Sequence, residues 1–146
     1  PGPCMYMEKI VVGPQAVGHI DITASATQNI KWVAKAKGES VRDLTVMILD
    51  RPRHKELIEE VRSTGARIKL ISDGDIFGAI ATSWPDAGVD ILIGIGGTPE
   101  GVVSAAALKC MGGKFRVACG HAMKKSVNRL WQLDTTCPKC SRPMTW

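Results

Sequence analysis

The sequence lacks long hydrophobic runs, internal repeats and low-complexity segments. No stretch approaches the roughly 18 apolar residues that a membrane-spanning helix needs, so we expect no such helix. The first residues, Pro1–Cys4, do not have the pattern of a signal peptide, and we expect a cytoplasmic protein whose five cysteines are reduced. The composition, 45% hydrophobic and 23% charged over 146 residues, excludes a disordered chain, a collagen-like fibre and a disulfide-rich miniprotein.

Acidic residues are nearly absent from the last part of the chain. Residues 1–115 carry 13 Lys or Arg and 13 Asp or Glu, whereas residues 116–146 carry 6 basic residues and one acid, Asp134. Three of the five cysteines also lie in residues 116–146. The net charge of +5 therefore comes from the tail and does not indicate a nucleic-acid-binding surface over the whole chain. We expect two regions, 1–115 and 116–146.

Residues 1–115 alternate strand signals with helix signals. Short apolar, partly β-branched runs predict strands, and apolar residues three or four positions apart predict helices. The predicted strands are 6–12, 45–49, 67–71 and 89–95. The predicted helices are 26–36, Pro52 to Gly65, Ile76 to a stop at Trp84 and Pro85, and 99–111. This alternation predicts an α/β fold with a mostly parallel sheet and flanking helices.

Polar or glycine-rich segments lie at the ends of three of the predicted strands. These segments are 50–54, 73–75 and 94–101. In sheets of this kind ligands bind beyond the carboxyl ends of the strands. The shared position of the three segments is the main signal for a functional site, because each segment alone is weak.

Arg51 and Arg53 flank Pro52 at the predicted start of a helix. Two guanidinium groups held there suit a phosphate, because their fork geometry allows paired hydrogen bonds and the helix start adds positive potential. The alternative is a solvated basic turn that pairs with glutamates of the following helix. His54 is expected to be a surface or capping residue rather than a catalytic base.

Asp73 and Asp75 stand on either side of a glycine. Two carboxylates so placed could accept hydrogen bonds from sugar hydroxyl groups or bind a metal ion. The alternative is structural, because Asp-Gly is a common turn and Asp75 is a suitable helix N-cap. Both interpretations stay open at this point.

The glycine-rich turn in 94–101 is neither a Walker A sequence nor a complete dinucleotide fingerprint. Thr98 is expected to be the N-cap and Pro99 the first helical residue, which places Glu100 second and not at the capping-box position. A carboxylate at the positive end of a helix stays ionised. Glu100 could therefore bind a metal ion or only stabilise the helix.

Four residues of the tail have the chemistry of a zinc site. Cys137 and Cys140 have the spacing of a zinc knuckle, and Cys119 and His121 could complete four ligands. The resulting alternative function is a small α/β binding protein whose tail binds zinc and contacts nucleic acid.

Five segments follow one another in a specific order and spacing. They are 6–10 (YMEKI), 49–54 (LDRPRH), 65–68 (GARI), 73–75 (DGD) and 94–103 (GIGGTPEGVV). Together they resemble the class II fructose-1,6-bisphosphatases, a family of bacterial and cyanobacterial enzymes of which some also use sedoheptulose bisphosphate. The resemblance runs from about Met5 to Phe115. It implies a sugar-phosphatase-like α/β fold and hydrolysis of the 1-phosphate of fructose 1,6-bisphosphate to fructose 6-phosphate and phosphate.

The resemblance also implies a ligand and its phosphate contacts. The ligand would be a sugar bisphosphate, and Tyr6, Arg51 and Arg53 would contact its phosphate groups. Arg51 stands where many members of the family have lysine, which keeps the charge. No nucleic acid or membrane partner is implied, and the parent enzyme is expected to be a homo-oligomer.

The remaining site residues follow from the same resemblance. Asp73 and Asp75 would hold the sugar, and Gly97 would approach it through its backbone. Glu100 would be a ligand of Mg or Mn. The family's other metal-binding carboxylates lie in a half that would precede Pro1, so we expect the chain to be the C-terminal part of the enzyme and inactive alone.

The resemblance is expected to end near Phe115, where the composition changes. One permitted back-translation of residues 116–126, when it is read two bases later, gives Gly-Arg-Leu-Trp-Pro-Arg-Asn-Glu-Glu-Glu, which resembles the segment that the family carries at this place. The tail is therefore interpreted as a product of a shifted reading frame, and its Cys-x-x-Cys pattern as an accident of that frame.

Overall fold

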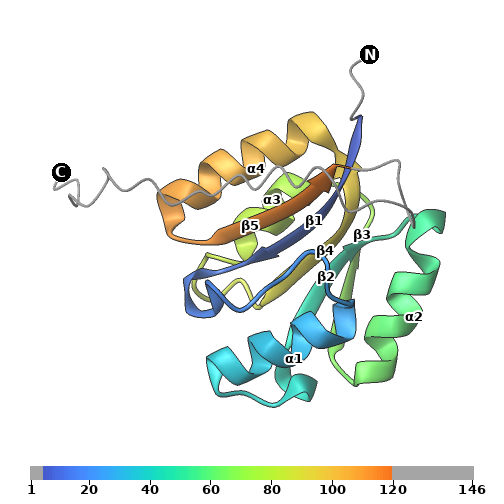
Figure 1. The fold of residues 1–146 in the computed structure, drawn as a ribbon, viewed down its shortest axis with the longest axis vertical. Helices are drawn as coiled ribbons and strands as arrows, with labels where there is room; N and C mark the ends of the chain where they lie inside the picture. The colour runs from blue at the N-terminus through green and yellow to red at the C-terminus, as the bar shows by residue number, and fades with distance from the viewer. Residues whose placement is uncertain (1–4, 120–146) are drawn as a thin grey trace, which may run out of the picture.

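A computed structural model describes residues 5–119, which form one five-stranded sheet covered by helices on both faces (Figure 1). The strands are β1 (Tyr6–Val12), β2 (Thr45–Leu49), β3 (Arg67–Ile71), β4 (Ile91–Gly97) and β5 (Lys114–Cys119). The helices are α1 (Ala26–Lys37), α2 (Lys55–Thr64), α3 (Asp75–Ala81) and α4 (Thr98–Met111), with 3-10 turns η1 (Pro14–Ala16), η2 (Val41–Asp43) and η3 (Pro52–His54). The predicted α/β fold is confirmed.

The strands lie in the order β3-β2-β4-β1-β5. β2 is parallel to β3 and β4, whereas β1 is antiparallel to both of its neighbours, β4 and β5. Four strands therefore run in one direction and β1 runs against them, so the prediction of a mostly parallel sheet is confirmed. The opposite direction of β1 was not predicted, because an apolar run does not encode the direction of its strand.

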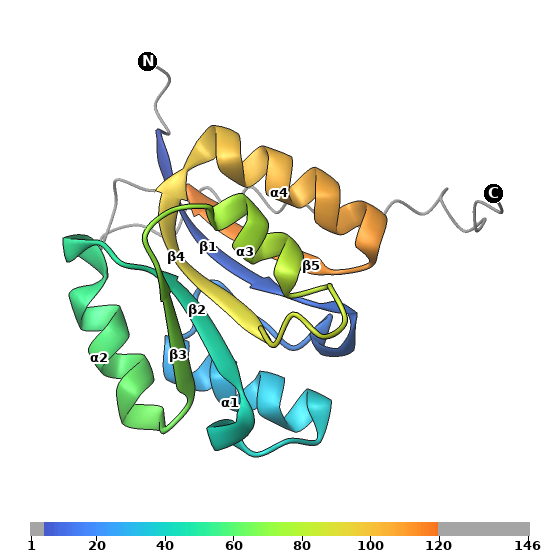
Figure 2. The ribbon, with the colours of Figure 1, turned by 180° about the vertical axis from the view of Figure 1, so that it is seen from behind.

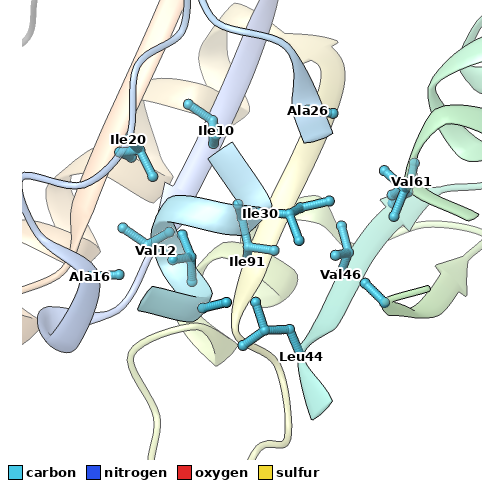
Figure 3. Close-up of a cluster of buried hydrophobic side chains, with 14 residues drawn as sticks. Ile10, Val12, Ala16, Ile20, Ala26, Ile30, Leu44, Val46, Val61 and Ile91 are labelled. Atoms are coloured by element: carbon cyan, nitrogen blue, oxygen red, sulfur yellow. The ribbon is translucent and has the colours of Figure 1, made fainter. Parts of the chain in front are cut away.

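Each face of the sheet has its own apolar core. Helices α1 and α2 cover one face, and α3 and α4 cover the other (Figure 2). On β1, Ile10 and Val12 point to the α1 and α2 side, where they pack with Ile30 (Figure 3). Met7 and Val11 belong to the core under α3 and α4. This alternation follows from the two-residue period of a strand.

The topology brings the candidate segments to one edge of the sheet. The carboxyl ends of β2, β3 and β4 lie at this edge, and the antiparallel β1 begins there, because Tyr6 is paired with Gly97. The predicted shared position of 50–54, 73–75 and 94–101 is therefore confirmed. We call this side of the sheet the carboxyl edge.

Strand β5 crosses the composition boundary at Phe115. Phe115 and Val117 are buried in the α3 and α4 core, so regular structure continues to Cys119. The alternation of Phe115 and Val117 with polar residues is the signal that could have predicted this strand.

The zinc-site residues His121, Cys137 and Cys140 and most of the stretch behind the reading-frame hypothesis lie outside the described residues. No helix within residues 5–119 is long and apolar enough to span a membrane.

Candidate functional site

Turn η3 places Arg53 over the end of β4. The turn begins at Pro52 directly after β2, and the Arg53 guanidinium donates from Nε and Nη2 to the carbonyl oxygen of Ile95 at 3.1 and 2.7 Å. The guanidinium carbon also lies 5.7 Å from the centre of the Tyr6 ring, within the range of a cation–π contact. Arg53 and Tyr6, both exposed, therefore lie next to each other, and their contact with a phosphate stays a prediction.

His54 is buried and holds η3 against the sheet. Its side chain is 1% exposed, Nδ1 lies 2.7 Å from the carbonyl oxygen of Leu49, and Nε2 accepts a hydrogen bond of 2.8 Å from the backbone N–H of Ile95. An accepting Nε2 together with a donating Nδ1 defines a neutral imidazole. The expectation of a surface residue was wrong, because the ring is buried between β2 and β4. His54 does stand at the N-cap position of α2, but its side chain makes no capping hydrogen bond there.

The pKa of His54 is lowered by burial, and the charges of Arg53 and Arg51 lower it further. In the unfolded chain His54 takes up a proton near pH 6.5, whereas in the folded chain it stays neutral until a lower pH. We expect the free energy of unfolding to fall as the pH drops below 6.5, by up to about 1.4 kcal/mol per pH unit. The free energy of unfolding stops falling for this reason once the pH is below the pKa that His54 has in the folded chain.

Urea denaturation of wild type and His54→Gln at pH 7.5, 6.5 and 5.5 measures this contribution. The variant should have the smaller decrease between pH 6.5 and 5.5, because glutamine does not titrate. His19→Gln, at an exposed position, is the control and should follow the wild type. Equal pH dependence of wild type and His54→Gln would contradict the assignment.

Arg51 lies at the same edge as Arg53 but has local contacts. Its Nη1 donates to the carbonyl oxygen of Asp50 at 3.0 Å, and the N–H of Asp50 donates to Ile71 of β3. Neither arginine forms an ion pair within residues 5–119. The alternative of a turn that pairs with glutamates is therefore not what the structure shows in that range.

The two aspartates after β3 have different surroundings. Asp73 is exposed and accepts a hydrogen bond from the N–H of Gly74 at 2.7 Å, which is an Asp-Gly turn contact. Asp75 is the first residue of α3, and its Oδ2 lies 2.5 Å from Nζ of Lys9. The N-cap is Gly74, in the left-handed conformation, so the expectation of Asp75 as N-cap was displaced by one residue.

Gly97 and Glu100 lie together where β4 passes into α4. The helix begins at Thr98 with Gly97 as N-cap, which makes Glu100 the third helical residue instead of the second. Glu100 thus occupies the capping-box position, contrary to the sequence-based expectation, and its side chain folds back over Gly97. A Cβ at Gly97 would lie 2.1 Å from Oε2 of Glu100, so only glycine allows this approach.

Glu100 is chemically suited to bind a divalent cation, since its carboxylate is exposed at the start of a helix. Mg and Mn prefer several oxygen ligands. Within residues 5–119, however, no three His, Cys, Asp or Glu side chains come close enough to hold a metal ion. Glu100 therefore fits as one ligand of a metal centre and does not form the centre with the other described residues.

Lys9 and the bracing role of His54 were missed by reasoning from the sequence. Lys9 lies between Met7 and Val11 on a face of β1 that is otherwise apolar, and a lysine at such a core position is the signal that could have indicated a buried ion pair. His54 gives no such signal, because its partners Leu49 and Ile95 are brought to it only by the folded sheet.

Comparisons with known proteins identify the family of this chain. The family model described as "Bacterial fructose-1,6-bisphosphatase, glpX-encoded" matches residues 1–140. Curated relatives from Microcystis aeruginosa and Synechocystis sp. are both 49% identical to this chain, and one from Crocosphaera subtropica is 48% identical, each over 114 residues. All three are named D-fructose 1,6-bisphosphatase class 2/sedoheptulose 1,7-bisphosphatase.

These alignments cover 78% of this chain and 33% of each relative, so the chain spans about a third of the length of the curated relatives it matches. The family match continues past Phe115, further along the chain than the five motif segments reach. By this match and by the relatives, the chain belongs to the family of bacterial, glpX-encoded fructose-1,6-bisphosphatases.

Proposed function

We propose that this chain forms the substrate-binding part of an enzyme that hydrolyses the 1-phosphate of fructose 1,6-bisphosphate. The products are fructose 6-phosphate and phosphate. The observation that carries the proposal is the meeting of an arginine pair, two aspartates and an exposed glutamate at one carboxyl edge. The names of the relatives support the same reaction.

The arginines would bind phosphate. The two hydrogen bonds of Arg53 to Ile95 use two of the five N–H groups of a guanidinium, so the other three can face an anion. The cation–π contact with Tyr6 and the bracing of η3 by His54 keep Arg53 in this orientation. Arg51 would add a second positive charge, which stabilises the doubly charged phosphate and the charge that develops during its transfer.

The acidic side would bind the sugar and orient it. Asp73 and Asp75 can accept hydrogen bonds from hydroxyl groups, and Gly97 would contact the ligand through its backbone, next to the Glu100 carboxylate that lies over it. Glu100 would supply one carboxylate to a divalent cation, Mg or Mn. When bound, such a cation polarises the phosphoryl group and activates water.

The remaining metal ligands would lie in the part of the relatives that the alignment does not cover. We also propose that the enzyme acts in the cytoplasm as a homo-oligomer, on a sugar bisphosphate and not on nucleic acid or membranes.

A chimera tests the proposal. Residues 5–119 replace the matched segment of the Synechocystis relative, and phosphate release from fructose 1,6-bisphosphate is followed with Mg or Mn. We expect metal-dependent turnover, and a chimera with both Arg51→Ala and Arg53→Ala should lose substrate binding while it stays folded. A folded chimera without any turnover would argue against the proposal.

The 146-residue chain alone is expected to release little or no phosphate at any Mg or Mn concentration. Hydrolysis of phosphate monoesters is among the slowest uncatalysed reactions, and a cation held by one carboxylate is too poorly positioned to overcome its barrier. The arginine pair should still give weak binding of the sugar bisphosphate. Robust metal-dependent phosphate release by the purified chain would show this expectation to be wrong.

A further inference from the structure

Lys9 is a buried lysine in the middle of β1. Its side chain is 3% exposed and points to the α3 and α4 side, between Met7 and Val11 of the apolar core. An ammonium group is strongly destabilised in such surroundings unless an opposite charge is held next to it. Lys9 therefore needs a fixed partner.

That partner is Asp75, at the first position of α3. Nζ of Lys9 lies 2.5 Å from Oδ2 of Asp75, whose side chain is 13% exposed. The bond thus joins a core position of β1 to a carboxylate that reaches the solvent at the carboxyl edge. Since Oδ2 is held by the ammonium group, Oδ1 is the oxygen that can accept a bond from a ligand.

The ion pair between Lys9 and Asp75 also packs against the backbone of β4. A Cβ on Gly96 would lie 2.7 Å from Oδ2 of Asp75 and 2.7 Å from Nζ of Lys9, so the ion pair occupies the space that a side chain would fill. Gly96 directly precedes Gly97, over which Glu100 folds. The ion pair therefore fixes Asp75 relative to the turn that carries these two candidate site residues.

We infer that Lys9 is a positioning residue, which holds the Asp75 carboxylate so that one oxygen faces the hydroxyl groups of the sugar bisphosphate. This inference rests on the proposed function, because it takes Asp75 as a sugar contact. Lys9 itself would touch neither the sugar nor the phosphates. Its effect should therefore depend on the hydroxyl groups of the ligand.

Lys9→Met in the 146-residue chain tests the inference. Methionine keeps the length of the side chain and its packing with Met7 and Val11 but removes the charge. Two probes are titrated by NMR: fructose 1,6-bisphosphate, and hexane-1,6-diol bisphosphate, which has the phosphates without the sugar hydroxyls. We expect the Kd for the sugar bisphosphate to rise about tenfold, as for loss of a charge-assisted hydrogen bond. The Kd for the diol bisphosphate should stay within about twofold of the wild-type value.

Two comparisons separate positioning from a general effect. In an Asp75→Asn background, Lys9→Met should cause no further loss of sugar binding, because the two residues act through one carboxylate. Lys31→Met, which removes an exposed charge on α1, should leave both Kd values unchanged. Equal weakening of both probes by Lys9→Met, or no weakening of either, would overturn the inference.

Two further measurements keep the inference testable apart from the proposed function. If the wild type binds neither probe, the proposed function fails. A crystal structure of Lys9→Met then tests the positioning role separately. If the Asp75 carboxylate keeps its place in that structure, the inference about Lys9 is overturned. If Lys9→Met does not fold, the ¹⁵N resonance of the Lys9 ammonium in the wild type is followed instead. It should shift with fructose 1,6-bisphosphate and not with the diol bisphosphate, and the reverse pattern would overturn the inference.

Discussion

Glu100→Gln in the chimeric enzyme is expected to lower phosphate release by at least about a hundredfold, since an amide is a much weaker ligand than a carboxylate for a hard divalent cation. The substitution keeps the shape of the side chain that folds back over Gly97. Glu100 is exposed, so loss of its favourable contact with the start of α4 should cost only about 0.3–1 kcal/mol of stability. The measurements are turnover as a function of Mn concentration and the melting temperature of each variant.

Glu59→Gln is the matched control for Glu100, because Glu59 is exposed on α2. It should leave both turnover and the metal requirement unchanged. If Glu100→Gln keeps turnover within a few fold of wild type at saturating metal, the carboxylate stabilises the helix only.

Arg53→Ala is expected to weaken binding of fructose 1,6-bisphosphate by about 10- to 100-fold, as for loss of hydrogen bonds to a charged group. Arg53→Lys should have the smaller effect, because lysine keeps the charge but cannot form the paired bonds that now go to Ile95. Both variants should also disturb the contact with Tyr6. Isothermal titration of the chimera with substrate, in the absence of metal to prevent turnover, measures the two losses.

Arg67→Ala controls for a general loss of positive charge. Arg67 begins β3, away from the carboxyl edge, and forms an exposed ion pair with Asp43 at 3.6 Å. Because such exposed pairs contribute little to stability, Arg67→Ala should leave the fold intact. Since Arg67 is also far from the candidate site, substrate binding should not change. If the alanine and lysine substitutions at Arg53 have equal and small effects on binding, Arg53 is a solvated turn residue that does not bind the substrate.

The sequence predicted the elements and their shared edge because these depend on local patterns. The run Thr45–Leu49 is apolar throughout, as expected for a strand covered on both faces, and β2 has these bounds. Segments at the carboxyl ends of parallel strands must meet at one edge, and 50–54, 73–75 and 94–101 do so, the last of them beginning within β4. The predicted boundaries of the elements were less accurate than their order, since β4 begins and ends two residues later than the predicted 89–95.

What the sequence could not predict depends on contacts between distant segments. The neutral His54 is fixed by the N–H of Ile95, and Lys9 is fixed by Asp75. No periodicity joins such residues, so their partners became known only from the arrangement of β1, β4 and α3. The capping position of Glu100 was displaced for a local reason, because Gly97 serves as N-cap in place of Thr98.

The place of β1 in the sheet determines when the site can form during synthesis. Of the five strands in residues 5–119, β1 leaves the ribosome first, yet its two partners β4 and β5 leave last, since Tyr6 pairs with Gly97 and Met7 with Cys119. Strand pairing between such distant segments is slow, because a long loop must close before any contact forms. Tyr6 and Lys9 therefore reach Arg53 and Asp75 only after almost all of residues 5–119 have been made. A chain that stops at Gly113 would leave β1 as an open, apolar edge strand, which promotes aggregation.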